Sequence, residues 1–275
     1  AKAGDGAATG ATLPDGFFNF FTTPQDIISG LGWGLGYFGM PHIIIRFMSL
    51  KSEKELRKSS VIGISWTTII LIMSALTAIA GRLYLGEIED SSTVFITMVR
   101  RIFPALVSGL LLSAILSAAM STADSQLLAA SSAFASDVYK PVIRKKASDS
   151  EMLWAGRIVV IVIAIVALFI ASDPNSGSIM GLVENAWGVF GASFGPVILL
   201  SLFWKRLTFG GTVAGIAVGA AVDILWLVFL SSTDIYEIVP GFAAGLLAAV
   251  VVSLLSKGPG KDVEDLFDRA VDLKS

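Results

Sequence analysis

The sequence predicts an all-α membrane protein, a multi-span helical bundle of about seven spans. Of its 275 residues, 54% are hydrophobic and only 15% are charged, whereas a soluble domain usually carries about 25% charged residues. Long apolar runs alternate with short charged clusters, as in successive membrane-spanning helices. The chain has no cysteine and a single histidine, so we expect neither a disulfide nor a histidine-rich metal site.

Residues 1–25 are expected to form an extracytoplasmic connector. The stretch up to Pro14 is small, polar and glycine-rich, which is typical of a flexible linker. It begins at Ala1 without methionine and lacks the pattern of a signal peptide, so we expect a piece of a longer protein. The phenylalanines that follow suit either a membrane interface or a buried loop contact: Phe17, Phe18, Phe20 and Phe21.

The first span, residues 26–48, contains five glycines and then Pro41: Gly30, Gly32, Gly34, Gly36 and Gly39. Each lowers helix propensity by about 1 to 3 kcal/mol, so we expect the middle of this span to be unwound. An interrupted apolar segment is the sequence sign of a binding site in secondary transporters, because its carbonyls and amides can face a ligand. The alternative is close helix packing, since Gly32 and Gly36 also fit a small-xxx-small pattern.

The other spans are expected at residues 61–83, 103–139, 158–170, 179–204, 210–230 and 238–255, with a short surface helix ending at Arg101. Placing the loops alternately on two sides puts nearly all their lysines and arginines on one side. The positive-inside rule makes that side the cytoplasm, with the N-terminal connector outside and the C-terminus inside. The tail, residues 257–275, has one apolar helical face and is expected to dock on the cytoplasmic surface.

The third span carries a hydroxyl stripe, formed by Ser113, Ser117, Ser121 and Ser125 at intervals of four residues. Ala118, Ser121, Thr122 and Ser125 share one face. Small residues allow a neighbouring helix to approach closely, and hydroxyl oxygens could bind a hard cation inside the membrane. Asp124 could tune such a site electrostatically, although a structural hydrogen bond to a neighbouring helix is favoured. We expect this face to meet the interrupted span at mid-membrane.

Other motifs exclude several classes of function. Residues 191–195 match the G-x-S-x-G pattern of hydrolases, but they lie in an apolar span with no preceding strand, so the match is accidental. The sequence has no phosphate-binding loop and no basic nucleic-acid-binding surface, so we expect no hydrolase, ATP-driven pump or nucleic-acid binder. Two acidic residues remain in spans: Glu184 near the outer end of one, and Asp223 deeper in the next without an evident partner.

Together these motifs resemble the sodium/solute symporter family. The resembling stretches are residues 32–39, 41–43, 118–128, 185–187, 194–196 and 236–242. The resemblance implies a leucine-transporter-like core, in which residues 26–204 form the second inverted five-helix repeat and residues 205–256 form two accessory helices. The first repeat would belong to a missing N-terminal half of the same protein.

The resemblance also implies site residues. Sodium would be held by the carbonyl of Ala118 and the hydroxyls of Ser121 and Thr122, together with carbonyls from the missing half. Proline-transporting members use the positions of Trp33, Tyr37 and Pro41 around the substrate, while Met40 stands where the family often has glutamine. We therefore expect sodium-coupled symport of proline or a similar small solute across the plasma membrane, the bacterial inner membrane.

Two alternatives remain from the sequence. Some relatives fuse this fold to signalling domains, so a membrane sensor is the second possibility. A structural membrane subunit, in which the glycines before Pro41 serve packing alone, is the third.

Overall fold

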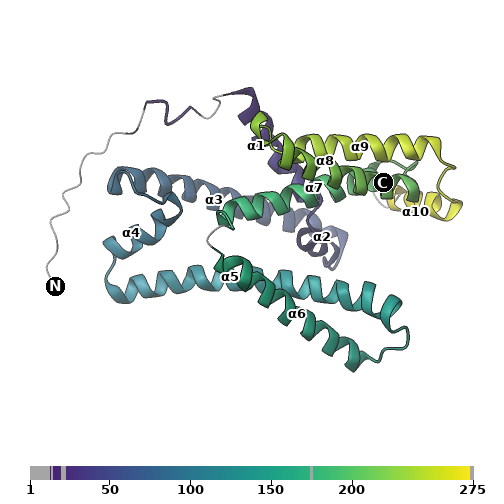
Figure 1. Cartoon of the computed structure of the whole chain (residues 1–275), viewed down its shortest axis with the longest axis horizontal. Helices are drawn as coiled ribbons and strands as arrows, with labels where there is room; N and C mark the ends of the chain where they lie inside the picture. Colours follow the sequence, from purple (N-terminus) through teal and green to yellow (C-terminus); the bar gives the residue numbers. More distant parts are fainter. Residues whose placement is uncertain (1–12, 14, 20–22, 174–175, 273–275) are drawn as a thin grey trace. The chain divides into compact units, whose positions relative to one another are not determined.

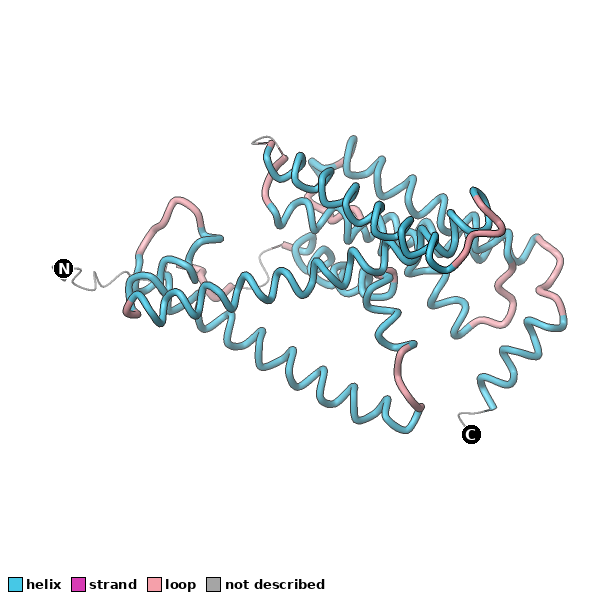
Figure 2. The backbone as a smooth tube through the Cα atoms, turned by 90° about the horizontal axis from the view of Figure 1, so that it is seen from below, coloured by secondary structure: helices cyan, strands magenta, loops and turns pink. Residues whose placement is uncertain are grey.

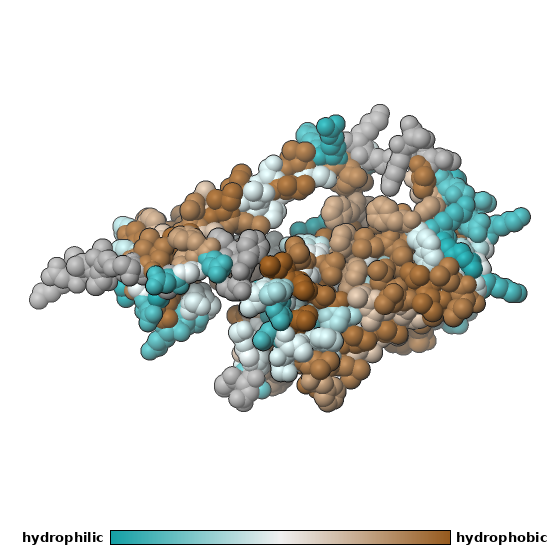
Figure 3. Space-filling model, turned by 90° about the horizontal axis from the view of Figure 1, so that it is seen from above, coloured by the Kyte–Doolittle hydropathy of each residue, from teal (hydrophilic) through white to brown (hydrophobic). Residues whose placement is uncertain are grey.

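The computed structural model describes residues 13, 15–19, 23–173 and 176–272, and these residues form helices joined by turns and loops, with no strand in the described ranges (Figures 1 and 2). The prediction of an all-α multi-span bundle is confirmed. Most of the connector expected at residues 1–25, including Phe20 and Phe21, lies outside the described residues. Hydrophobic side chains cover much of the face seen in Figure 3, with hydrophilic patches at its margins.

Six helices in the described part are long and apolar enough to cross a membrane. They are α3 (Glu53–Leu85), α5 (Ala105–Ala133), α6 (Asp149–Ser172), α7 (Ile179–Phe203), α8 (Phe209–Phe229) and α9 (Ile238–Leu255). The π-helical segment η3 (Phe134–Ile143) continues α5, and the resulting 39 residues exceed what a hydrocarbon core about 30 Å thick requires. The span expected at residues 26–48 consists of two short helices, described below.

The chain divides into two compact units. The first unit comprises residues 1–20 and 49–160, and the second comprises residues 21–48 and 161–275. In the first unit, the 3₁₀ turn η2 (Ser91–Thr93) and the short helix α4 (Val94–Ile102) connect α3 to α5. Gly81 of α3 lies against Val94 of α4. The Ser108 hydroxyl at the start of α5 donates a hydrogen bond of 3.0 Å to the carbonyl of Val99.

In the second unit, α7, α8 and α9 pack closely through glycines, and α8 and α9 run side by side (Figure 1). A methyl group on Gly215 of α8 would lie 2.8 Å from a methyl carbon of Val197 on α7, and one on Gly241 of α9 would lie 2.8 Å from the Cβ of Ala192. Both distances are shorter than van der Waals contact allows, so only glycine fits. Ala192 and Ile238 are fully buried at the centre of this unit.

The second unit closes at one end with polar contacts. Thr208 caps α8, and its backbone N–H donates to the hydroxyl of Ser253 on α9 over 3.1 Å. Arg206 donates to the carbonyl of Ser256, just after the last turn of α9. The tail helix α10 (Lys261–Asp272) is joined to the turn between α7 and α8 by an ion pair of 2.6 Å between Lys205 and Asp268. The 3₁₀ turn η4 (Ser231–Thr233) connects α8 to α9 at the opposite end.

Candidate functional site

The helix at the start of the second unit is interrupted. Helix α1 (Pro24–Trp33) begins with a capping box between Thr23 and Asp26, and it ends in a 3₁₀ turn, η1 (Gly34–Phe38). Gly39 and Met40 are not helical, and α2 (Pro41–Met48) starts at the proline. Proline has no N–H to donate and suits the first position of a helix, so Pro41 restarts the helix after the break.

An aromatic cluster holds this interruption against α7 and α9. The indole N–H of Trp187 on α7 donates a hydrogen bond of 2.9 Å to the carbonyl of Trp33. The ring of Trp33 stacks on Trp187 with centroids 5.6 Å apart, and it stacks on Tyr236 at 5.8 Å. Tyr37 meets Trp187 edge-on at 4.9 Å. One carbonyl at the end of α1 is therefore satisfied by a side chain from another helix.

Three of the glycines bring the backbone of the interruption against its neighbours. A side chain at Gly36 would overlap the indole of Trp187, one at Gly39 would overlap the backbone of Phe190, and one at Gly32 would meet Val239. Gly30 and Gly34 have no such neighbour within 4 Å. Close packing thus explains Gly32, Gly36 and Gly39. The other two glycines lower the helix propensity of the segment without any packing role among the described residues.

The three positions predicted to contact substrate lie along this interruption. Trp33 is half-buried between Trp187 and Tyr236, so its ring is largely occupied by packing. Tyr37 is 51% exposed. Pro41 is exposed at the start of α2. Among these side chains, Tyr37 is therefore the one best placed to reach a bound molecule.

Sequence reasoning did not name Trp187 or Tyr236 as site residues. Tyr236 stacks on Trp33, and its hydroxyl donates 2.8 Å to the carbonyl of Glu184. Both residues lie within the stretches that carry the family resemblance. A buried tryptophan in an apolar helix, or a buried tyrosine just before one, needs a partner for its polar atom, and that need could have directed attention to them.

The predicted cation ligands lie together on one face of α5, in the first unit. The hydroxyl of Thr122 donates to the carbonyl of Ala118 over 3.2 Å, and the hydroxyl of Ser125 donates to the carbonyl of Ser121 over 2.9 Å. Ala118, Ser121 and Thr122 are all exposed in this chain, as is Asp124. The other residues of the hydroxyl stripe, Ser113 and Ser117, bond back to their own helix in the same way.

This face of α5 suits a hard cation chemically. A hydroxyl that donates its hydrogen to the preceding turn keeps its oxygen lone pairs for a cation, and oxygen is the ligand atom that hard cations prefer. One helix face offers only a few such oxygens, so further ligands would have to come from another element. Within the described part of the chain, no group of three or more His, Cys, Asp or Glu side chains is placed to hold a metal ion.

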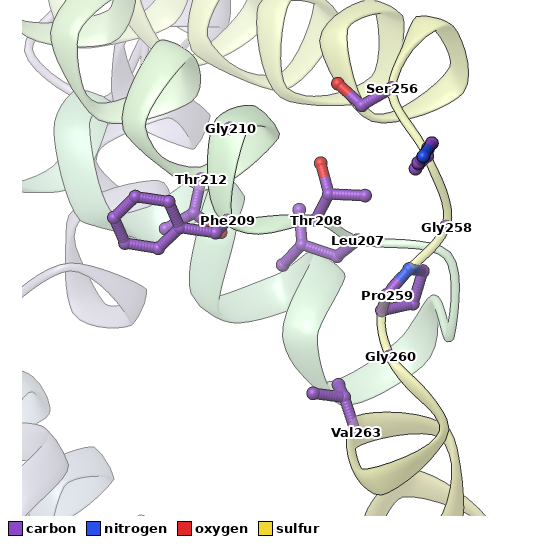
Figure 4. A pocket seen from close by; sticks show the side chains of 11 residues that line it. Leu207, Thr208, Phe209, Gly210, Thr212, Ser256, Gly258, Pro259, Gly260 and Val263 are labelled. Atoms are coloured by element: carbon purple, nitrogen blue, oxygen red, sulfur yellow. The ribbon is translucent and has the colours of Figure 1, made fainter.

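A cavity of about 600 Å³ opens at the other end of α9, away from the interruption (Figure 4). It lies between the start of α8 and the loop that leads into α10. Phe209, Thr208 and Pro259 are among its lining side chains, together with Lys257. None of the residues predicted from the sequence to bind substrate or sodium lines it.

Six apolar helices, an interrupted segment and a helix with a hydroxyl stripe define a multi-pass membrane protein. Residues 6–219 match the family described as "Sodium:solute symporter family". This match covers well over half of the sequence, so the chain belongs to that family.

The most similar curated proteins include several proline transporters. The chain is 44% identical over 279 residues to the "High-affinity proline transporter PutP" of Bacillus subtilis, covering 99% of this chain and 59% of that protein. It is 46% identical over 261 residues to the "Sodium/proline symporter" of Haemophilus influenzae, covering 90% and 52%. The "Osmoregulated proline transporter OpuE" of Bacillus subtilis is 44% identical over 247 residues, covering 88% and 50%. The chain thus spans about half the length of these relatives, which are transporters by name rather than enzymes.

Proposed function

We propose that this chain is the C-terminal part of a transporter that carries proline, or a similar small solute, into the cell together with sodium. Its similarity to named sodium/proline symporters supports this proposal. The structural observation that carries it is the interruption between α1 and α2, because an interrupted helix inside an apolar protein exposes backbone polar groups to a ligand. The remaining half of the transporter would supply the inverted repeat.

In this proposal the solute binds along the interruption. Tyr37 contacts it directly, and Trp33 and Pro41 shape the local backbone. The hydrogen bond from Trp187 fixes the carbonyl of Trp33, which keeps the end of α1 in one position. A ligand recognised by backbone groups at a fixed break needs few side-chain contacts for its orientation.

Sodium is cargo in this proposal and binds at α5. The carbonyl of Ala118 and the hydroxyls of Ser121 and Thr122 face one side of the helix and supply uncharged oxygen ligands. Ser125 lies one turn further along the same face and would affect the site through its hydrogen bond to the carbonyl of Ser121. Asp124 would affect the site through the electric field of its carboxyl group. A membrane potential of 100 mV contributes about 2.3 kcal/mol for each sodium ion carried across. Since about 1.4 kcal/mol corresponds to a factor of ten, one ion supports more than a tenfold solute gradient.

We place the protein in the plasma membrane of a bacterium, with residues 1–25 outside and residues 257–275 in the cytoplasm. The basic residues of the loops support this orientation, because lysine and arginine concentrate on the cytoplasmic side. Sodium and solute would bind from outside and be released inside as the two repeats rock between two arrangements.

Uptake of radiolabelled proline into proteoliposomes tests the proposal. The full-length transporter should accumulate proline when an inward sodium gradient is applied, and should accumulate little with potassium in place of sodium. Binding of solute without any uptake would favour the sensor alternative. Equal uptake in sodium and potassium would contradict sodium coupling.

A further inference from the structure

Two carboxyl groups lie buried where α7, α8 and the start of α9 meet. Asp223 of α8 is 0% exposed, and Glu237, directly before α9, is 8% exposed. Both face Gly188 of α7: a Cβ there would lie 3.1 Å from Oδ1 of Asp223 and 3.4 Å from Oε1 of Glu237. The two carboxyl groups therefore occupy the space that the absent side chain of this glycine leaves open.

Three of the four oxygens of these carboxyl groups have no hydrogen-bond partner among the described residues. Neither oxygen of Asp223 accepts or donates a hydrogen bond among the described residues, and neither does Oε1 of Glu237. Helices α7, α8 and α9 contain no lysine, arginine or histidine. The titratable groups around the pair are Tyr236 and, from α7, Glu184. The carboxylate of Asp26 on α1 instead accepts hydrogen bonds from the N–H and the hydroxyl of Thr23.

Burial of this kind is incompatible with two negative charges. An ionised carboxylate in an apolar interior costs several kcal/mol unless it is paired or hydrogen-bonded. Two neighbouring carboxylates also repel each other, so one of them takes up a proton far more readily than an isolated group would. The same physics applies just outside the span, where burial and then the nearby Glu184 raise the pKa of Glu237.

We propose that Asp223 and Glu237 form a proton-binding site that retains at least one proton at neutral pH. A proton fits better than a metal ion, because Glu184 and the pair are not placed as a group that could hold a metal ion within the described part of the chain. The sequence marked Asp223 as a deep acidic residue without naming a partner. The structure supplies Glu237 as that partner. Glu237 lies 14 positions after Asp223 in the chain, on the other side of the turn between α8 and α9.

The position of the pair links it to the interrupted helix. Glu237 directly follows Tyr236, whose ring stacks on Trp33. Gly188 directly follows Trp187, whose indole bonds to the Trp33 carbonyl. Loss of the proton would leave a net charge between these two contacts and weaken the packing that holds the interruption. Because the neutral form is the one favoured in the folded protein, the stabilisation is present at low pH and is lost as the pH rises.

Infrared spectroscopy of the full-length transporter in lipid tests this site without any transport measurement. The carbonyl stretch of a protonated carboxyl group is distinct from the bands of a carboxylate. At pH 7, about three units above the ordinary pKa of a carboxyl group, the wild-type protein should show this band. Asp223→Asn and Glu237→Gln should each remove or shift it. The matched control is Asp234→Asn in the adjoining exposed turn, which should leave the band unchanged.

Thermal unfolding gives a second readout. The melting temperature of the wild-type protein should fall as the pH rises, and this fall should be smaller in Asp223→Asn and in Glu237→Gln. Each variant removes one of the two carboxyl groups, so the test survives if one variant fails to fold. The proposal is overturned if both variants retain the wild-type band. It is also overturned if sodium abolishes the band at constant pH, because the pair would then bind a cation.

Discussion

The spans of the two units are similarly apolar, yet they are buried to different extents. In the most apolar windows of α3 and α5, in the first unit, 0% and 6% of the residues are buried within the chain. The corresponding shares for α7 and α9, in the second unit, are 39% and 33%. Apolar composition makes a helix suitable for a membrane, but lipid is as apolar as leucine, so composition does not make helices associate.

What differs is the placement of small residues. In α7, α8 and α9 the glycines face one another across the helix contacts, so backbones approach closely. In α5 the hydroxyls of Ser113, Ser117 and Ser121 lie on an exposed face. A face of this type is suited to a helix or a ligand that this chain does not contribute, which agrees with a chain spanning about half the length of its relatives.

The largest expected effect comes from exchanging glycine for alanine in each unit. In Gly219→Ala, the new methyl group would lie 2.9 Å from the carbonyl carbon of Ala192, so we expect a loss of about 1 to 3 kcal/mol or more from overpacking. In Gly109→Ala of α5, nothing lies within 4 Å, so we expect a gain of up to about 1 kcal/mol from helix propensity. Thermal unfolding of the purified full-length protein measures both. A destabilising Gly109→Ala would show that another helix covers this part of α5.

The next effect concerns the ion. Replacing both Ser121 and Thr122 by alanine removes two oxygen ligands. Hydrogen bonds to charged groups contribute about 1.5 to 3 kcal/mol, and a similar loss here would raise the sodium concentration for half-maximal uptake about ten- to a hundredfold. The control replaces Ser113 and Ser117, whose hydroxyls donate to carbonyls one turn earlier, as the hydroxyl of Thr122 does. Equal sodium dependence in the two double variants would refute the assignment of the ion site.

A smaller effect is expected at the indole that anchors the interruption. Trp187→Phe keeps most of the ring and leaves the Trp33 carbonyl without its donor, which should cost about 1 kcal/mol. Trp226→Phe is matched, because that indole also donates to a carbonyl, 3.2 Å away on Ile235. Both variants should lose similar stability, but only Trp187→Phe should change the KM for proline. Unchanged uptake kinetics in Trp187→Phe would move the substrate site away from the interruption.

The smallest effect is expected at the exposed ion pair of α10. The hydrogen bond that Lys205 donates to Asp268 raises the pKa of Lys205, so the stabilisation by this pair is fully present below the ordinary lysine pKa and is lost as the pH rises through the raised pKa. Asp268→Asn should leave the melting temperature unchanged within error, because exposed pairs are screened by water. Limited proteolysis should release α10 faster. An unchanged cleavage rate would mean that other contacts hold the tail.

Much of the fold could be predicted from the sequence, because hydropathy and helix breakers act locally. The apolar runs locate the six long helices, and the glycines before Pro41 account for the gap between α1 and α2. The serines from Ser113 to Ser125 recur every four residues, so the helical repeat alone places their hydroxyls on one winding stripe. The family resemblance was confirmed by the match over residues 6–219.

Contacts between distant parts of the chain could not be predicted in this way. The bond from Trp187 to Trp33 joins positions 154 residues apart, and the shared contact of Asp223 and Glu237 with Gly188 depends on how three helices pack. Local rules determined which segments are helical, where one of them breaks and which residues share a face. The tertiary structure decided which glycines face a neighbour and which acidic groups are sealed from water, because burial depends on the whole surrounding bundle and not on the adjacent residues.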